Sequence, residues 1–102
     1  MNISYMAIPD LNISVLEFID NSCNISGVKR VDVISKKRNR EFTDVRHLIC
    51  YFLMQKLDNS VKTARFMNLD HASVLHAVKK TNNLIIKDKN FRQKYELIKT
   101  LI

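Results

Sequence analysis

Apolar residues recur at three- and four-residue spacing along the middle of the chain. Between residues 44 and 57 they stand at Val45, Leu48, Ile49, Phe52, Leu53 and Leu57. A helix turns about once every 3.6 residues, so this spacing gathers them on one face. Thr43 offers a hydroxyl for the N-cap, and Asp44 favours the positive end of the helix dipole. We therefore predict a helix that follows Thr43 and forms the centre of the fold.

Shorter patterns of the same kind flank this central helix. The same spacing predicts helices over residues 11–22, 61–67 and 91–102. Residues 58–60 supply a stop and a new cap, and residues 82–90 are expected to hold the connector that precedes the last helix. Val31–Ile34 predicts a single turn or an extended piece that enters the core. Residues 1–10 are expected to form a lead, either disordered or a partner-binding arm, ahead of a domain over residues 11–102.

Residues 66–80 have the pattern of the second half of a helix-turn-helix. Asp70 can cap a helix by accepting the backbone N–H of Ala72 or Ser73, after a short turn at Asn68-Leu69. The helix would then have apolar positions at Val74, Ala77, Val78 and Ile85, and polar positions at His76, Lys79, Lys80 and Asn83. Two interpretations fit this pattern: an ordinary capped surface helix, or a recognition helix whose first turn meets base edges in the major groove.

Composition favours an all-α fold in a single domain. The 102 residues include one glycine and one proline, whereas sheet-rich domains of this size need more turn residues. Hydrophobic residues make up 46% of the chain, enough for one small core. Cys23 and Cys50 are too few for a disulfide framework, and Cys50 is predicted to be a buried free thiol. We predict a small domain of about five helices.

Charge is unevenly distributed along the chain. Residues 29–102 hold all 17 basic residues and seven of the ten acidic ones, a net charge of +10. Such an excess suits a polyanionic partner, and contacts to phosphates would make binding depend strongly on salt. The densest basic run is Ser35–Arg40. Taken alone, this run fits a solvated charged loop as well as a contact to DNA.

Several classes of function find no support in the residues. The longest apolar stretch, Leu48–Met54, is far shorter than the roughly 20 residues that span a bilayer. No secretory signal is visible, so a cytoplasmic location is expected. One glycine is too few for a phosphate-binding P-loop, and His71 and His76 are not spaced as a metal-binding pair. We expect no enzyme activity, no cofactor and no metal site.

Two segments carry a resemblance to a known family. The run S-K-K-R-N-R at residues 35–40, with the Arg46-His47 pair after it, resembles the signature S-K-R-R-x-R…R-Q. The run D-H-A-S-V-L-H-A-V-K-K at residues 70–80 resembles D-H-T-T-V-L-H-A-x-x-K. Both signatures belong to the C-terminal duplex-binding domain of the bacterial replication initiator DnaA, and the likeness covers residues 11–101. It implies a Trp-repressor-like helix-turn-helix fold, here as a stand-alone domain without the ATPase domain of the initiators.

The resemblance also implies which residues meet DNA. The recognition helix would enter the major groove and the basic loop the adjacent minor groove, where a narrow A·T-rich groove favours arginine. The base-reading positions would be Arg38 in the minor groove and Asp70, His71, Ala72 and Ser73 in the major groove. The phosphate-binding positions would be Lys36, Lys37, Arg40, Arg46, His47, Lys62, His76, Lys79 and Lys80.

Three departures from the family pattern bear on the DNA target. Met67-Asn68-Leu69 replaces the usual Gly-Gly-Arg, Ala72 replaces the first threonine, and a proline common in the preceding helix is absent near Val61-Lys62. Duplex binding is therefore better supported than binding to a DnaA box of the TTATNCACA type.

The expected function is sequence-specific binding of double-stranded DNA in replication initiation or its regulation. The alternatives are a protein-interaction module and a transcriptional repressor of phage or mobile-element origin. Besides double-stranded DNA, the expected partner is full-length DnaA or another replication protein. We expect a monomer that is associated with the nucleoid and has no membrane partner.

Overall fold

The computed structural model describes the backbone of residues 3–102 and the side chains from Ser14 onward. Its helices are α1 (Ile3–Ile25), α2 (Arg30–Ile34), α3 (Arg40–Leu57), α4 (Ser60–Met67), α5 (His71–Lys87) and α6 (Lys89–Lys99). No strand occurs among these residues, so the predicted all-α fold is confirmed. The helix count exceeds the prediction because the segment around Val31–Ile34 forms the short helix α2. Within the described part, no helix is long and apolar enough to cross a membrane.

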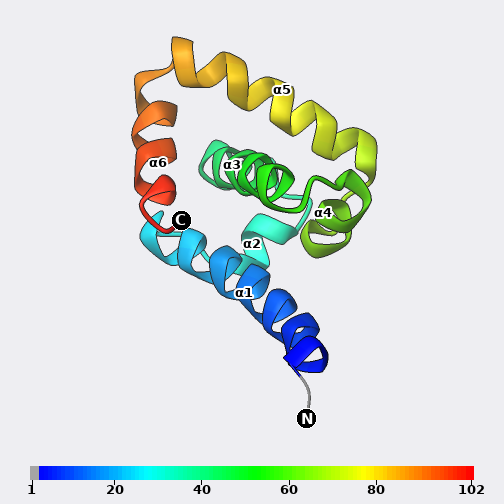
Figure 1. The fold of residues 1–102 in the computed structure, drawn as a ribbon. Coiled ribbons are helices and arrows are strands. Elements are labelled where there is room, and N and C mark those ends of the chain that lie inside the picture. The colour runs from blue at the N-terminus through cyan, green and yellow to red at the C-terminus, as the bar shows by residue number, and fades with distance from the viewer. Residues whose placement is uncertain (1–2) are drawn as a thin grey trace.

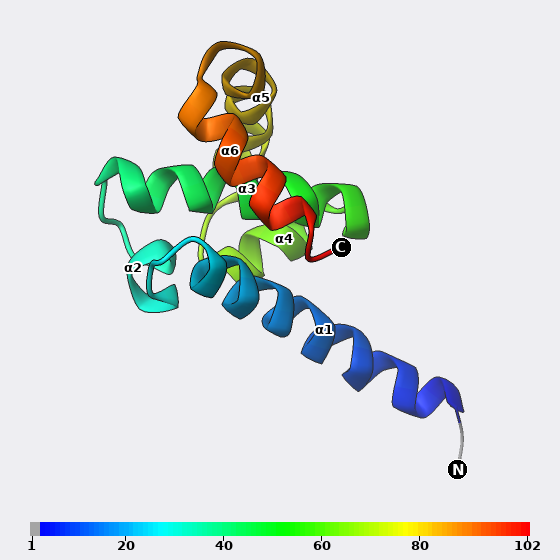
Figure 2. The same cartoon turned by 90° about the vertical axis from the view of Figure 1, so that its left-hand side faces the viewer.

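Helix α3 lies at the centre of the molecule, with α5 on one side and α1 on the other (Figure 1, Figure 2). Its core-facing side chains are fully buried, namely Val45, Leu48, Ile49 and Leu53. Cys50 is buried beside them as a free thiol, and burial raises the pKa of this thiol to about 12. The predicted central helix and the predicted buried thiol are both confirmed.

Helix α3 begins at Arg40 and not beyond Thr43, as the sequence had suggested. The carbonyl of Asn39 accepts the backbone N–H groups of Phe42 and Thr43 at 2.9 and 3.0 Å, while its side chain makes no capping bond. An ion pair of 3.3 Å between Arg40 Nε and Asp44 Oδ1 joins the first turn to the second. Thr43 therefore lies inside the helix, although its hydroxyl made it a good candidate for the cap.

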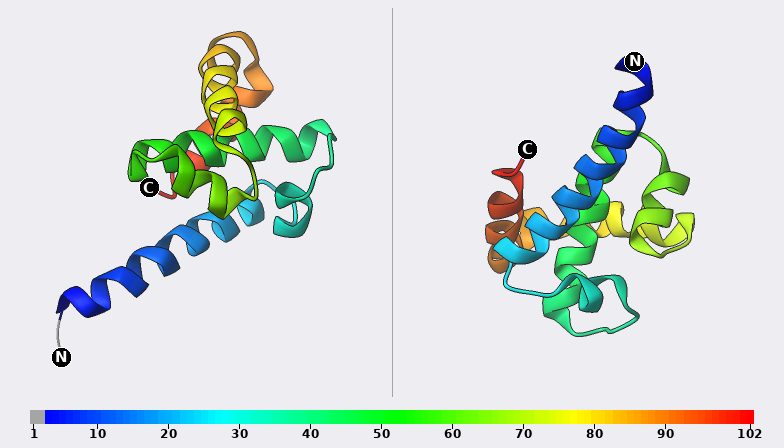
Figure 3. Two further views of the ribbon diagram at one scale, coloured as in Figure 1. Left: turned by 90° about the vertical axis from the view of Figure 1, so that its right-hand side faces the viewer. Right: turned by 90° about the horizontal axis from the view of Figure 1, so that it is seen from below.

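Helix α1 begins at Ile3 and not at Leu11, where the apolar pattern begins. Its C-terminal half packs on the core through Val15, Ile19 and Cys23. Its N-terminal half projects beyond the other helices (Figure 2, Figure 3). A projecting helix needs no core-facing period, which is why apolar spacing located only the packed part. Residues 3–10 of the expected lead thus belong to α1, and Met1 and Asn2 lie outside the described residues.

Helices α4 and α5 form the helix-turn-helix with the caps that the sequence predicted. The Asn59 side chain caps α4 by accepting the backbone N–H of Lys62 at 2.9 Å. The helix ends at Met67, and the φ of its C-cap Asn68 is 57°, a left-handed conformation that asparagine tolerates better than most residues. Asp70 caps α5 by accepting the backbone N–H of Ser73 at 2.7 Å. The short turn predicted at Asn68 is therefore confirmed.

Helix α5 runs through Asn82 and Asn83 and ends at Lys87. The connector lies within the predicted zone but is a single residue, Asp88. The Asp88 carboxylate caps α6 by accepting the backbone N–H of Phe91 at 3.1 Å. The Phe91 side chain is buried, so α6 closes the core as the sequence predicted.

Candidate nucleic-acid interface

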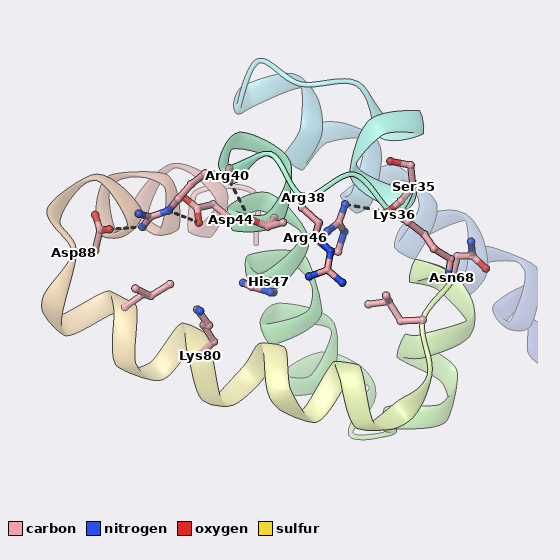
Figure 4. A pocket seen from close by; sticks show the side chains of 13 residues that line it. Ser35, Lys36, Arg38, Arg40, Asp44, Arg46, His47, Asn68, Lys80 and Asp88 are labelled. Atoms are coloured by element: carbon pink, nitrogen blue, oxygen red, sulfur yellow. Dashed lines mark hydrogen bonds and ion pairs between the residues drawn. The ribbon is translucent and has the colours of Figure 1, made fainter.

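Three segments that lie far apart in the sequence border one groove. They are the α2–α3 loop (residues 35–39), the first half of α3, and the turn before α5 together with the later half of α5, at Lys80 and Leu84, and Asp88. The groove between them has a volume of about 680 Å³ (Figure 4). Among its lining residues are six that the sequence analysis selected: Lys36, Arg38, Arg40, Arg46, His47 and Lys80. The fold therefore brings the two signature segments together.

The first turn of α5 presents a polar edge to solvent. His71 and Ala72 are exposed, whereas Ser73 is half-buried. The pKa of Asp70 is lowered first by the backbone N–H of Ser73, then by the Ser73 hydroxyl, and to a smaller extent by the charges of His71 and Lys36. Asp70 is thus an ionised cap, and the contribution of Lys36 places the basic loop close to the start of α5.

The rest of α5 is divided into a buried and an exposed side. Val74, Ala77 and Thr81 are buried, and the Thr81 hydroxyl donates to the carbonyl of His47 at 3.2 Å. The exposed positions include His76, Lys79, Lys80 and Asn83, which are the four polar positions expected from the sequence. The helix is thereby fixed against α3 while its basic side remains open.

The basic loop between α2 and α3 is ordered by its own polar contacts. The Ser35 hydroxyl donates to the carbonyl of Asp32 at 2.6 Å and accepts the backbone N–H of Lys37 at 3.1 Å. The Lys37 ammonium pairs with the Asp32 carboxylate at 2.6 Å. Lys36 and Arg38 are exposed. These two side chains are therefore the ones that the loop presents to a ligand.

Arg46 points into the protein, toward the same loop (Figure 4). Its side chain is buried, and its Nε donates to the carbonyl of Val33 at 2.6 Å. Its Nη2 donates to the carbonyls of Ser35 and Lys37, each at 3.0 Å, and more weakly to that of Asp32 at 3.4 Å. Burial lowers the pKa of the guanidinium below its ordinary value. Arg46 was expected to bind phosphate, but its Nε and Nη2 donate to backbone oxygens instead.

Arg40 is held by two carboxylates. Besides its contact with Asp44, its Nη2 pairs with Asp88, so the start of α3 is tied to the junction of α5 and α6. Hydrogen bonds to Asp88 and then to Asp44 raise the pKa of Arg40. Lys94 of α6 also pairs with Asp44, at 3.1 Å. Arg40 lies at the groove, but part of its charge is already compensated.

His47 lies half-buried in the groove wall. Burial is the largest cause that lowers its pKa to about 4, and the charge of Lys80 is the next. Its Nδ1 is buried without a hydrogen-bond partner among the described residues. The His76 ring packs edge-on against it, with ring centroids 6.3 Å apart. His47 is therefore neutral at pH 7 and can offer a hydrogen bond but no charge.

Not all predicted residues line this groove. Eight of the fourteen predicted residues lie outside its lining, among them all four expected in the major groove: Lys37, Lys62, Asp70, His71, Ala72, Ser73, His76 and Lys79. The two acidic residues of the site, Asp44 and Asp88, were not among the predicted site residues. The spacing Arg40-x-x-x-Asp44 indicates an ion pair within a helix, but no sequence pattern indicated Asp88. It also gave no role to Leu69, which lines the groove at the turn.

Comparison with known proteins connects these features to a family. The family described as "Bacterial dnaA protein helix-turn-helix" matches residues 17–81. The matched span includes the packed part of α1, the basic loop, α3, α4 and most of α5. It therefore contains every residue that lines the groove except Leu84 and Asp88.

Several chromosomal replication initiator proteins named DnaA are similar to this chain. The protein of Aliarcobacter butzleri (strain RM4018) is 32% identical over 93 residues, which cover 89% of this chain and 21% of that protein. The protein of Brucella abortus biovar 1 (strain 9-941) is 34% identical over 77 residues, which cover 74% and 16%. The protein of Streptococcus agalactiae serotype Ia is 32% identical over 78 residues, which cover 74% and 17%.

The chain spans about a fifth or less of the length of these relatives. The family match, by contrast, covers more than half of this chain. With the helix-turn-helix geometry and the two signature segments, it shows that the chain belongs to the bacterial dnaA protein helix-turn-helix family.

Proposed function

We propose that this chain binds double-stranded DNA, with the start of α5 in the major groove and the α2–α3 loop in the adjacent minor groove. The observation that carries the proposal is the closeness of the loop to the turn that leads into α5: Lys36 and Arg38 line the same groove as Asn68 and Leu69, and the charge of Lys36 acts on Asp70. A recognition helix and a flanking basic arm that face the same side are the arrangement in which one domain reads two adjacent grooves. Membership in a helix-turn-helix family supports the same function.

The residues proposed to contact bases differ in how far they are exposed to solvent. In the major groove, His71 and Ala72 are open to solvent and would meet base edges directly. Ser73 is half-buried and its hydroxyl interacts with Asp70, so we propose a smaller role for it. Asp70 would accept from a cytosine N4 through the oxygen that the cap leaves free. In the minor groove, Arg38 would supply the permanent charge that a narrow groove attracts.

The proposed phosphate contacts come from side chains around the groove and along α5. The exposed candidates are Lys36, Lys62, His76, Lys79 and Lys80. His47 would donate a hydrogen bond as a neutral ring. Lys37 and Arg40 would contribute less, because carboxylates already compensate their charge.

We further propose that the target resembles a DnaA box and that the chain acts in replication initiation or its regulation, on the nucleoid and as a monomer. The relatives are named chromosomal replication initiator proteins, and this supports the role. Full-length DnaA or another replication protein is the proposed protein partner. The turn Met67-Asn68-Leu69 sets the entry of α5 and is where a preference for a different box would arise.

Arg38→Ala provides the test of duplex binding by this face. We expect it to weaken binding to an A·T-rich duplex by about tenfold, because it removes the minor-groove contact. Lys56→Ala is the matched control, since Lys56 is exposed near the other end of α3 and outside the groove, and loses the same charge. Fluorescence anisotropy at fixed salt measures both. Equal losses in the two variants would show that only overall charge matters and would contradict the proposed orientation.

A further inference from the structure

We propose that Arg46 is a positioning residue for DNA binding: it fixes the backbone of the α2–α3 loop so that Lys36 and Arg38 face the DNA, and does not grip phosphate itself. This inference rests on the proposed function, because it assigns a role within that same interface. Its structural part, the ordering of the loop, is open to measurement without DNA.

The hydrogen bonds of Arg46 join two separate elements to α3. The carbonyls of Asp32 and Val33 belong to α2, and those of Ser35 and Lys37 belong to the loop. The last carbonyls of a helix have no partner within it, and α2 is too short to satisfy them by itself. A planar guanidinium with five N–H donors can serve several such acceptors at once, which an ammonium group cannot do in the same geometry.

The bonded carbonyls are placed where they control the exposed side chains. Ser35 and Lys37 flank Lys36, and Lys37 directly precedes Arg38. Fixing the carbonyls of Ser35 and Lys37 therefore fixes the peptide group that leads into Lys36 and the one that leads into Arg38, while the bond from the Lys37 N–H to the Ser35 hydroxyl holds the peptide group between Lys36 and Lys37. Lys36 and Arg38 are exposed, although the backbone that carries them is bonded to a buried side chain. This is the arrangement expected of a preorganised binding loop.

The burial of Arg46 argues against a direct phosphate contact. Its exposed fraction is 8%, whereas Lys36 and Arg38 are exposed. Its Nε and Nη2 already donate to carbonyl oxygens at 2.6 and 3.0 Å, so a phosphate that bound these groups would have to displace the carbonyls; only Nη1 has no hydrogen bond among the described residues. Because those carbonyls would then lose their partners, the exchange would disorder the loop that the interface needs.

Arg46→Lys separates the two roles, because it keeps the charge and removes the planar fork. In the free protein, we expect backbone ¹⁵N order parameters for residues 36–39 to fall from about 0.85, typical of rigid backbone, to below about 0.6. Arg38→Ala, the control, should leave them unchanged. Arg46→Met, which buries no ammonium group, gives a second measurement if the lysine variant does not fold. A loop that stays rigid in a folded Arg46 variant would overturn the inference.

A double-mutant cycle on an A·T-rich duplex tests the consequence for binding. If Arg46 acts through the loop, Arg38→Ala should weaken binding by about tenfold in the wild-type background and by less than about threefold beside Arg46→Lys. If Arg46 binds phosphate directly, the two losses should be independent, and this result would overturn the inference. A wild-type protein that binds no duplex would refute the proposed function, while the order parameters would still decide whether Arg46 orders the loop.

Discussion

At the scale of single residues, His47 shows how the fold changes the chemistry that a sequence suggests. A histidine among lysines and arginines looks like an additional cation for DNA. Burial, followed by the charge of Lys80, instead lowers its pKa to about 4. The ring is neutral under physiological conditions because the surrounding positive charges and the loss of water both oppose protonation.

This lowered pKa predicts a specific pH dependence of stability. The unfolded chain takes up a proton on this residue below about pH 6.5, whereas the folded protein does so only near pH 4. The stabilising contribution of the neutral ring is therefore complete above pH 6.5 and is lost as the pH falls toward 4.

His47→Gln removes this titration and keeps a polar side chain. Between pH 6.5 and 4, we expect the free energy of unfolding to fall by about 1–2 kcal/mol more in the wild type than in the variant, a value reduced for the partial exposure of the ring. Chemical denaturation at a series of pH values measures the difference. Asp70 and Asp88 also have lowered pKa values, but they titrate in both proteins and cancel. Parallel pH profiles would show that folding does not lower the pKa of His47.

At the scale of helices, capping residues decide where the helix-turn-helix begins and ends. Asp70 was recognisable from sequence because its side chain makes the cap, and so was the segment that contains Asn59. The start of α3 was not recognisable from sequence, because Asn39 caps it with a backbone carbonyl, which any residue could provide. The Asp70 cap thus left a signal in the sequence, whereas the backbone contact of Asn39 left none.

The Asp70 cap predicts a difference between two substitutions. Asp70→Ala removes the acceptor for the Ser73 N–H and should lower the midpoint of thermal unfolding by a few degrees. Asp70→Asn keeps a side-chain oxygen at the cap and should retain most of that stability. Thermal unfolding of the two variants measures the difference. Equal stability of both variants with the wild type would mean that the cap does not hold the start of α5.

At the scale of the whole molecule, the interface depends on contacts between elements that no local pattern reveals. The apolar period of α3 was sufficient to predict the core, because burial of Leu48 and Leu53 leaves a regular mark in the sequence. The contacts of the buried Arg46 and the pairing of Arg40 with Asp88 produce no such pattern, since both kinds of contact join residues from separate segments. Six of the predicted positions line the groove, but the sequence did not reveal which side chains face it and which support its walls.

The measurement that tests the account most directly is equilibrium binding of the wild-type protein to two duplexes over a salt series. One duplex carries TTATCCACA and the other has the same composition in scrambled order. We predict tighter binding to the first duplex at every salt concentration, with both affinities falling steeply as salt rises because phosphate contacts release counterions. Equal affinity for the two duplexes at all salt concentrations would contradict sequence reading by α5. Absence of binding to either would contradict the DNA-binding function itself.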